Sequence, residues 1–384
     1  MIKCKGLLVF NIHGVIIMLK KFSVENFKNF NTRITLDLSQ PGNFEFNNEV
    51  IRNGIISKGL VYGPNGSGKS NLGIAIFDII LHMTDKQKEL ERYNPYLCLN
   101  SNNDVAKFEY VFQFNDVEVN YQYSKTGPNS LVEERLQIDN QEVLFYDFRI
   151  GRGKVRLAGA ENLNLSSGDS PISRVKFVKN NAILSNDPIT ETFNSFVNFV
   201  DNMLLFYSLD SRGYQGFEVG ISKVGENIIL NHHTQDFSNF LSEQGLNYNL
   251  IEREVNGTQQ LYCQFNNKEI NFYSIASTGT ISLSLFYYWF TKLSSVSFAF
   301  IDEFDAFYHF ELAASIVKMV RSFKDTQIFL TTHNTDLMSN DLLRPDCYFL
   351  IGENHIKTIT QLTDKELRKA HNLQKMYKAG AFHE

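Results

Sequence analysis

The sequence of 384 residues predicts an α/β fold with a parallel sheet at its centre and an antiparallel sheet attached to it. Three observations lead to this prediction. Residues 55–83 form an apolar strand pattern, a glycine-rich loop and an apolar-faced helix pattern in succession. Residues 108–148 alternate apolar and polar side chains between short turns, which is typical of antiparallel strands. Residues 280–351 alternate helix and strand patterns, which favours parallel strands joined by helices.

The composition is that of a folded chain in a reducing compartment. Apolar residues make up 43% of the sequence, which is enough to bury a large core, and 42 acidic against 37 basic side chains leave a net charge of −5. That balance excludes a protein that coats nucleic acid by bulk charge, although a local basic groove remains open. The four cysteines are far apart and form no C-x-x-C, so we expect no disulfide framework and no zinc ribbon, and a cytoplasmic location fits.

The first 17 residues are expected to be an N-terminal extension. The apolar stretch 7–18 is interrupted by Asn11, His13 and Gly14, has no small-residue cleavage site after it, and is too short to span a bilayer. We therefore place the natural start at Met18.

From Met18 onward, the helices and strands are predicted from the spacing of apolar residues and from the turn-forming residues between them. The segments 18–30 and 32–38 predict a starting hairpin, 55–62 a strand and 71–83 a helix. After the alternating region, the remaining elements are expected as strands at 174–178, 249–254, 260–265, 296–302, 327–332 and 347–351, and helices at 189–206, 235–244, 280–293 and 310–323. A capping box at Thr363-Asp-Lys-Glu366 predicts the start of a last helix that Gly380 closes.

The loop Gly63-Pro-Asn-Gly-Ser-Gly-Lys-Ser70 fits the pattern G-x-x-x-x-G-K-[ST] between a strand and a helix. Glycines allow backbone N–H groups to turn inward around a phosphate, and the helix N-terminus adds partial positive charge. Lys69 is predicted to reach the β- and γ-phosphate oxygens, and the Ser70 hydroxyl to ligate Mg²⁺. The predicted nucleotide-binding residues here are Gly63, Asn65, Gly66, Gly68, Lys69 and Ser70.

Two adjacent acids end the apolar strand Phe298-Ala-Phe-Ile-Asp302-Glu303. If this strand lies beside the strand that precedes the glycine loop, Asp302 reaches the magnesium shell, and Glu303 faces the γ-phosphate as the residue that orients or deprotonates the attacking water. Alone, such a pair is more often a solvated strand end. The glycine loop upstream reverses that balance in favour of a metal ligand and a catalytic base.

Two further motifs suit a phosphate. A buried strand pattern ends at Thr331-Thr-His333, where the His333 imidazole could hydrogen-bond the γ-phosphate or its water, or merely cap a turn. Ser277-Thr-Gly279-Thr stands at a helix start, where Ser277 and Gly279 could bind a phosphate, although a plain N-cap explains the same residues.

The order of these four motifs resembles that of ABC-type ATPase heads, including the SMC, RecF and OLD-like branches. The segment Val24-Glu-Asn-Phe-Lys-Asn-Phe30 is similar to the sequence near the N-terminus of proteins in those branches. The resemblance implies that the serine-glycine segment is the signature motif, and that Ser277 and Gly279 of one subunit close over ATP and Mg²⁺ held by another. It also implies a homo-oligomer, at least a dimer. His309 stands where the family has an aspartate, and no Q-loop glutamine is assigned.

A closer resemblance covers nearly all of the chain from Met18. The start "MLKKFSVENFKNF", the strand end "IDEFDAFYH" and the closing "LRKAHNLQKMYKAGAF" resemble the bacterial AAA/ABC-type "ATP/GTP phosphatase" proteins of phage-defence modules, typified by RloA, AbiLi and the AriA subunit of the PARIS system. This implies an ATPase half of a two-gene, abortive-infection type system, with a separately encoded effector such as a Toprim nuclease.

On this resemblance the chain divides into four parts. Residues 1–17 are the extension, and 18–148 are the first ATPase part with the glycine loop and the antiparallel strands. Residues 149–270 are a mixed insertion, and 271–384 are the second ATPase part with the signature, the two acids, the histidine and the final helix.

Other functions remain to be weighed. A transporter ATPase fits poorly, since 208 positions separate Lys69 from Ser277 (277 − 69) and the signature differs; the absence of heptads excludes SMC proper. A RecF-like DNA-repair ATPase is the main alternative, with DNA contacts made by basic residues that we interpret first as a solvated loop: Arg149, Arg152, Lys154, Arg156, Arg174, Lys176 and Lys179.

Overall fold

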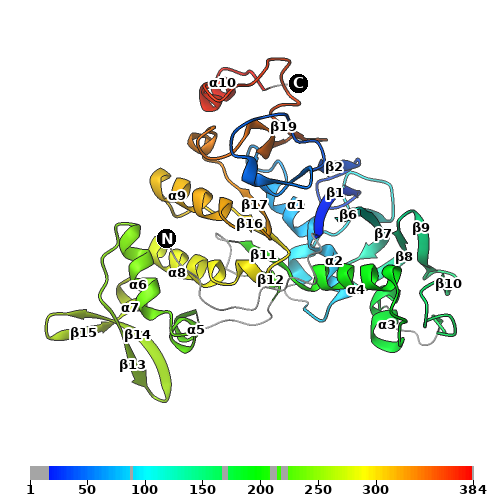
Figure 1. The fold of residues 1–384 in the computed structure, drawn as a ribbon, viewed down its shortest axis with the longest axis horizontal. Helices are drawn as coiled ribbons and strands as arrows, with labels where there is room; N and C mark the ends of the chain where they lie inside the picture. The colour runs from blue at the N-terminus through cyan, green and yellow to red at the C-terminus, as the bar shows by residue number, and fades with distance from the viewer. Residues whose placement is uncertain (1–16, 87–89, 167–171, 208–213, 218–223, 383–384) are drawn as a thin grey trace.

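A computed structural model describes residues 17–86, 90–166, 172–207, 214–217 and 224–382. Two seven-stranded sheets dominate this part of the chain, one antiparallel throughout and the other with a parallel centre (Figure 1). The predicted α/β fold class, with a parallel sheet and an antiparallel subdomain, is confirmed.

The antiparallel sheet has the strand order β10-β9-β8-β7-β6-β1-β2. Its strands are β1 (Ile17–Glu25), β2 (Ile34–Asp37), β6 (Ala106–Phe114), β7 (Val117–Gly127), β8 (Ser130–Ile138), β9 (Gln141–Asp147) and β10 (Arg152–Val155). The starting hairpin is confirmed, since β1 pairs with β2. It is not separate from the later strands, because β1 also pairs with β6, where Val24 lies opposite Phe108. One face is buried and the other is polar, as the alternating sequence predicts.

The second sheet has the order β12-β11-β16-β17-β5-β18-β19. Its strands are β5 (Lys58–Tyr62), β11 (Met203–Tyr207), β12 (Tyr214–Gly216), β16 (Phe298–Asp302), β17 (Gln327–Thr331), β18 (Tyr348–Ile351) and β19 (Ile356–Thr358). The five strands from β11 to β18 are parallel and the two edge strands are antiparallel. The functions predicted for Asp302 and Glu303 were conditional on β16, the strand of the two acids, lying beside β5. That condition is not met, because β17 lies between the two strands.

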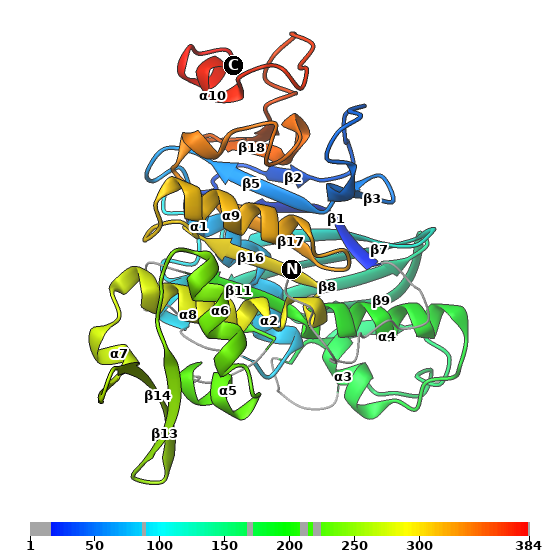
Figure 2. The same ribbon diagram turned by 60° about the vertical axis from the view of Figure 1, so that its left-hand side comes forward.

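The described residues form ten α-helices, which pack on the different sheets and on one another. The longer ones are α1 (Lys69–Ile76), α3 (Arg174–Asn181), α4 (Pro188–Asp201), α6 (Thr234–Glu243), α8 (Thr278–Phe290) and α9 (Phe310–Arg321), and the shorter ones are α2 (Asp78–Met83), α5 (Val224–Leu230), α7 (Phe272–Ile275) and α10 (Leu373–Lys378). The views in Figures 1 and 2 place α1 and α9 on opposite faces of the parallel sheet. Gly73 of α1 packs on Phe300 of β16, and the Tyr110 hydroxyl of β6 donates to the Ala75 and Ile76 carbonyls of the same helix, so α1 contacts both large sheets.

A small sheet projects from the lower part of the view in Figure 2. It consists of β13 (Leu250–Val255), β14 (Thr258–Phe265) and β15 (Lys268–Asn271), and it leads through α7 into α8. The first two of these strands were predicted. A short hairpin of β3 (Ile51–Arg52) and β4 (Ile55–Ile56) precedes β5.

Three predicted elements are wrong. Residues 174–178 form a helix and not a strand, because the Ser173 hydroxyl caps α3 by accepting the N–H of Lys176. The helix expected at 189–206 ends at Asp201, and its apolar continuation becomes β11, which pairs with β16 in the sheet. The last helix begins after Asn372, whose side chain caps it, and not at the Thr363 box. Gly380, at φ +77°, follows the end of that helix as predicted.

The predicted N-terminal extension falls almost entirely on residues 1–16, outside the described part of the chain; Ile17 already pairs with Phe114 in β1. No helix within the described ranges combines the length and the apolar character needed to cross a membrane.

One glutamine side chain joins the two large sheets. Gln327, at the start of β17, is buried; its Oε1 accepts the Leu19 N–H at 2.6 Å and its Nε2 donates to the Leu19 carbonyl at 2.8 Å. Leu19 lies at a register shift in β1, where the strand ladder is irregular. The glutamine amide therefore replaces a missing strand partner.

Removing this amide should destabilise the fold. We expect Gln327→Leu to lower the free energy of unfolding by about 2–3 kcal/mol, because the buried Leu19 N–H and C=O lose their partner. Urea unfolding followed by circular dichroism measures this change. Gln264→Leu, at an exposed position of β14, is the matched control and should change it by about 0.5 kcal/mol or less. Equal effects of the two substitutions would contradict the structural role of Gln327.

Candidate functional site

The glycine loop follows β5 and turns sharply into α1. Gly66 and Gly68 have φ of +80° and +104°, which side-chain-bearing residues rarely adopt. A Cβ on Gly68 would lie 2.5 Å from Asn29 Nδ2, and one on Gly63 would lie 2.4 Å from Ser67 Oγ. The loop is thus closely packed and needs glycine at these positions, as the motif predicts.

Lys69 is the first residue of α1, and its side chain folds back onto the loop. Its Nζ donates to the carbonyl oxygens of Gly63 at 2.9 Å and Pro64 at 3.2 Å, and lies 3.5 Å from His333 Nδ1. Burial lowers the pKa of the Lys69 amino group, while the charges of Glu303 and Asp302 act in the opposite direction. A phosphate can replace these neutral carbonyls with a stronger, charge-assisted hydrogen bond.

Predicted residues from three chain segments meet in one cavity. This cavity, of about 140 Å³, is lined by loop and helix residues between Asn65 and Asn71 together with Glu303 and His333. Glu303 comes from the end of β16 and His333 from the end of β17, and Glu303 Oε1 lies 3.6 Å from His333 Nε2. The carboxyl ends of neighbouring parallel strands therefore bring the predicted base, the predicted histidine and the phosphate loop together.

Asp302 stands just behind this cavity. Its Oδ1 accepts a hydrogen bond from Thr331 Oγ1 at 2.6 Å, and it does not belong to the cavity lining, whereas Ser70 does. The Asp302 carboxylate is held by Thr331, whereas the chain turns at Glu303, at φ +47°, and the Glu303 carboxylate lines the cavity.

The donor set fits a nucleotide with a divalent metal. Lys69 Nζ, which supplies positive charge to the cavity, donates to the neutral carbonyls of Gly63 and Pro64 within the glycine loop, and a phosphate oxygen is a stronger acceptor. The Ser70 hydroxyl and the Asp302 carboxylate are hard oxygen ligands of the kind that Mg²⁺ prefers.

The predicted signature residues lie apart from the cavity lining. Ser277 caps α8 by accepting the Thr280 N–H at 3.1 Å, so the plain N-cap function is present. Ser277 is exposed, and a Cβ on Gly279 would approach the Phe307 carbonyl at 3.0 Å. Neither residue lines the cavity of the same chain.

The predicted basic run does not form a single surface. Arg174 is buried, its guanidinium stacked over the Tyr146 ring at 4.4 Å, so it is a core residue. Lys176 pairs with Asp85 and Lys179 with Asp201, both at 2.6 Å. The other exposed bases lie on and beside the edge strand β10. They are Arg149, which is 3.6 Å from Asp147, and Arg152, Lys154 and Arg156. Charged side chains are common on such edges, where they discourage further strand pairing.

Three residues near the site were not predicted. Asn29 accepts from Asn71 Nδ2 at 2.7 Å and donates to the Ser67 carbonyl at 3.4 Å, which ties the loop after β1 to the glycine loop. Ser67 belongs to the motif itself but occupies an unspecified position in it. Thr331 precedes His333 and contacts both acids. A polar residue ending a buried strand was the available signal for Thr331.

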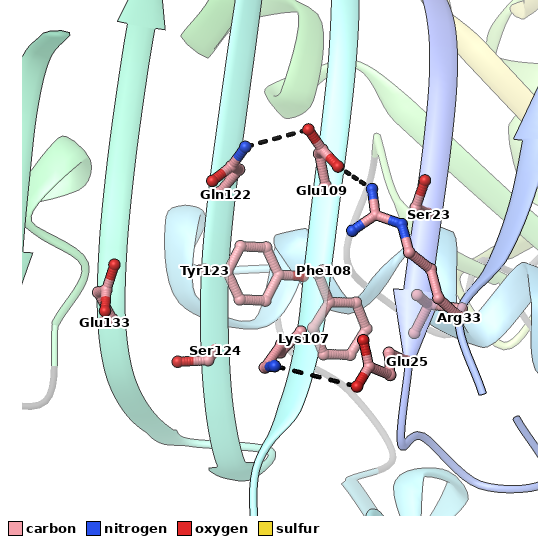
Figure 3. Close-up of a pocket in the computed structure, with 11 residues that line it drawn as sticks. Ser23, Glu25, Arg33, Lys107, Phe108, Glu109, Gln122, Tyr123, Ser124 and Glu133 are labelled. Carbon is pink, nitrogen blue, oxygen red and sulfur yellow. Dashed lines mark hydrogen bonds and ion pairs between the residues drawn. The ribbon is translucent and has the colours of Figure 1, made fainter. Parts of the chain in front are cut away.

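A second cavity, of about 230 Å³, opens on the polar face of the antiparallel sheet (Figure 3). Its basic side chains already have acidic partners: Arg33 pairs with Glu109, and Lys107 lies 3.9 Å from Glu25. With a further acid, Glu133, in its lining, this cavity is net negative and repels a triphosphate. The glycine-loop cavity is therefore the better nucleotide site.

The loop, the sheet order and the acids at the strand ends define a P-loop nucleoside triphosphatase fold. The chain belongs to the family described as "AAA domain, putative AbiEii toxin, Type IV TA system", whose model matches residues 60–339. It is thus an AAA-type ATPase.

Solved structures similar to this chain are remote in sequence. The SMC head domain from Thermotoga maritima is 16% identical, with 88% of this chain and 98% of that chain covered and a TM-score of 0.40. The Smc head domain bound to the C-terminal domain of ScpA, from Pyrococcus furiosus, is 13% identical, with 90% and 98% covered and a TM-score of 0.45. The recombination mediator RecF with ATP is 14% identical, with 90% and 99% covered and a TM-score of 0.38. No curated protein matches the sequence.

Proposed function

We propose that this chain is the ATP-binding and ATP-hydrolysing subunit of a bacterial anti-phage system of the abortive-infection type. In this proposal copies of the chain associate through shared ATP sites and control a separately encoded effector, such as a Toprim nuclease. The description of the family, which names an AbiEii toxin, supports the defence context. The cavity that joins the glycine loop to Glu303 and His333 supports the hydrolytic activity, and it is the observation on which the proposal depends most.

The chemistry follows from the positions of the side chains. Lys69 Nζ exchanges the carbonyls of Gly63 and Pro64 for the β- and γ-phosphate oxygens. Glu303 accepts a proton from the attacking water as the water oxygen bonds to the γ-phosphorus, while the bond from the γ-phosphorus to the β,γ-bridging oxygen breaks and ADP leaves with the electron pair. His333 hydrogen-bonds the γ-phosphoryl group. Mg²⁺, held by Ser70 and Asp302, would neutralise phosphate charge when bound.

A second copy is proposed to complete the site. Ser277 and Gly279 are accessible at the start of α8 but absent from the cavity lining of their own chain, which supports a role in trans. The helix start offers N–H groups and partial positive charge to a phosphate that another copy holds.

Mixing two inactive variants tests this sharing. Ser277→Arg should retain ATP binding but block association, and Lys69→Ala should lose nucleotide while keeping an intact Ser277 helix. Each variant alone forms no complete site. A dimer that pairs the two variants has one complete site, made from Lys69 of the Ser277→Arg chain and Ser277 of the Lys69→Ala chain, so part of the wild-type phosphate release should return in the mixture. The measurement is steady-state ATP hydrolysis of the mixture against each variant alone.

The matched control is the double variant Lys69→Ala/Ser277→Arg, which cannot complete a site with either single variant. Activity restored only in the mixture of single variants supports a shared site. A mixture no more active than its components would contradict it.

The effector proposal is tested by co-expressing the chain with the product of the adjacent reading frame. We expect the two proteins to co-purify. We also expect the Glu303→Gln substitution to change the amount of partner that co-purifies, because this variant retains ATP and the proposal makes binding of the partner depend on the bound nucleotide. The alternative, a DNA-repair ATPase, predicts instead salt-sensitive duplex DNA binding that Lys154→Ala with Arg156→Ala abolishes. The pairing of Lys176 and Lys179 with acids disfavours that alternative.

A further inference from the structure

The last residue of β17 connects the two acids at the end of β16. Thr331 is fully buried, and its Oγ1 donates to Asp302 Oδ1 at 2.6 Å while accepting the Glu303 N–H at 2.7 Å. A hydroxyl has one proton, so these two contacts fix its direction. The Thr331 carbonyl also accepts the Phe304 N–H at 3.2 Å, so Thr331 makes hydrogen bonds to three successive residues where β16 ends and the chain turns.

The turn that Thr331 holds is unusual at Glu303. This residue has φ of +47°, in the left-handed region that residues with a Cβ seldom adopt unless their surroundings enforce it. The left-handed conformation ends β16 and coincides with the placement of the Glu303 carboxylate in the cavity beside His333. Without the Thr331 contact, the Glu303 N–H would lose the hydrogen-bond partner that supports this conformation.

The position of β17 explains why a threonine there can act on both acids. β17 lies between β5 and β16, and Thr331 pairs with Val61, two residues before the glycine loop begins. The strand therefore sets the spacing between the loop and the acids, and its last side chain faces the acids at the point where they turn toward the loop.

We propose that Thr331 is a positioning residue for hydrolysis, whose hydroxyl holds the Asp302 carboxylate and the left-handed Glu303 backbone in the arrangement that water activation requires. This inference rests on the proposed function of Glu303. Thr331 does not line the cavity and acts only through the two acids. Nucleotide affinity, which depends on the loop and Lys69, should therefore be separable from its effect.

The test compares substitutions that differ in one hydroxyl. Thr331→Val keeps the branched shape but leaves Asp302 Oδ1 and the Glu303 N–H without their partner, and it should lower kcat on the order of 10–100-fold through misplacement of the base. KM and the affinity for ATP should stay within about threefold, because the loop is unchanged. Thr331→Ser retains the hydroxyl and should restore kcat to within about threefold of wild type.

The control for lost stability is Thr326→Val, at the residue immediately before β17. Thr326 is also buried, and its hydroxyl donates to the Leu293 carbonyl. It precedes the first residue of β17, whereas Thr331, which contacts the two acids, is the last. We expect Thr326→Val to lower the melting temperature as much as Thr331→Val does, with kcat unchanged. If the valine variant does not fold, Thr331→Ala serves in its place.

The outcomes separate this inference from the proposed function. A kcat of Thr331→Val at least about fivefold below both Thr331→Ser and Thr326→Val, at constant ATP affinity, supports the inference. If the kcat of Thr331→Val differs less than this from those of the two other variants, while Glu303→Gln still hydrolyses ATP slowly, the inference about Thr331 is overturned and the proposed function of Glu303 stands. Full activity of Glu303→Gln overturns the proposed catalytic function itself, whatever Thr331 does.

Discussion

A Glu303→Gln protein is expected to bind ATP normally and to hydrolyse it about 10²–10⁴ times more slowly than wild type. The amide keeps the size and planar shape of the carboxylate in the cavity, so the glycine loop should keep the conformation that binds the phosphates. It cannot accept a proton from the attacking water, so only the hydrolytic step is lost. Phosphate release in the steady state, together with binding of a fluorescent ATP analogue, measures the two effects separately.

The same variant should collect in the associated form, because ATP that is not hydrolysed keeps the shared sites closed. Light scattering with and without ATP gives the particle size. Glu366→Gln, at an exposed glutamate that pairs with Arg368, is the matched control and should behave as wild type in both assays. A Glu303→Gln protein that hydrolyses ATP at the wild-type rate would contradict the assignment of this carboxylate as the base.

Lys69→Ala is expected to weaken ATP binding on the order of 100-fold or more, with hydrolysis lost as a consequence. Lys69 is 5% exposed and supplies the positive charge in the cavity nearest the loop carbonyls of Gly63 and Pro64. Its removal takes a charge-assisted hydrogen bond from the phosphates. Isothermal titration of ATP into the protein measures the change in Kd.

Lys365→Ala, at an exposed lysine in the loop before the last helix, controls for the loss of one positive charge and should leave Kd unchanged. The melting temperature without nucleotide should be similar for both variants, because Lys69 contacts only loop carbonyls and His333 in the described structure. Tight ATP binding by Lys69→Ala would show that the triphosphate binds elsewhere.

Local sequence predicted the parts of this site that depend on local geometry. The glycine loop is one continuous segment whose turn needs glycine at fixed positions, so its pattern could be recognised directly. Asp302, Glu303 and His333 end apolar strand patterns, and strands of a parallel sheet direct their carboxyl ends to one edge. The meeting of Glu303 with the loop was predicted on the condition that its strand lies beside β5. It occurs with β17 between them, because β5, β17 and β16 are parallel and end at the same edge of the sheet.

The order of the strands could not be predicted, because pairing depends on contacts between segments that are far apart in sequence. Nothing local indicates that β17, which starts at Gln327, lies between β5 and β16. The same limit explains β11: its apolar residues continue the spacing of the preceding helix, and only their pairing with β16 makes them a strand. The contacts of Thr331 could not be predicted for the same reason, since they are made to Asp302 and Glu303 at the end of the neighbouring strand β16.

Competing caps explain the errors in the helices. Thr363 and Glu366 match a capping box, but the Thr363 hydroxyl instead accepts the N–H of Lys365 in a short turn, and Asn372 caps the helix that forms. Ser173 caps α3 and overrides the strand pattern of its apolar residues. In both places a single side-chain hydrogen bond decided between local conformations of similar propensity.

The most direct test of this account is the structure of the Glu303→Gln protein with ATP and Mg²⁺ bound. The account predicts the γ-phosphate between Lys69 and His333 of one copy, with Ser277 and Gly279 of a second copy closing over it. A triphosphate bound outside the glycine-loop cavity, or a start of α8 that faces away from every bound phosphate, would contradict it.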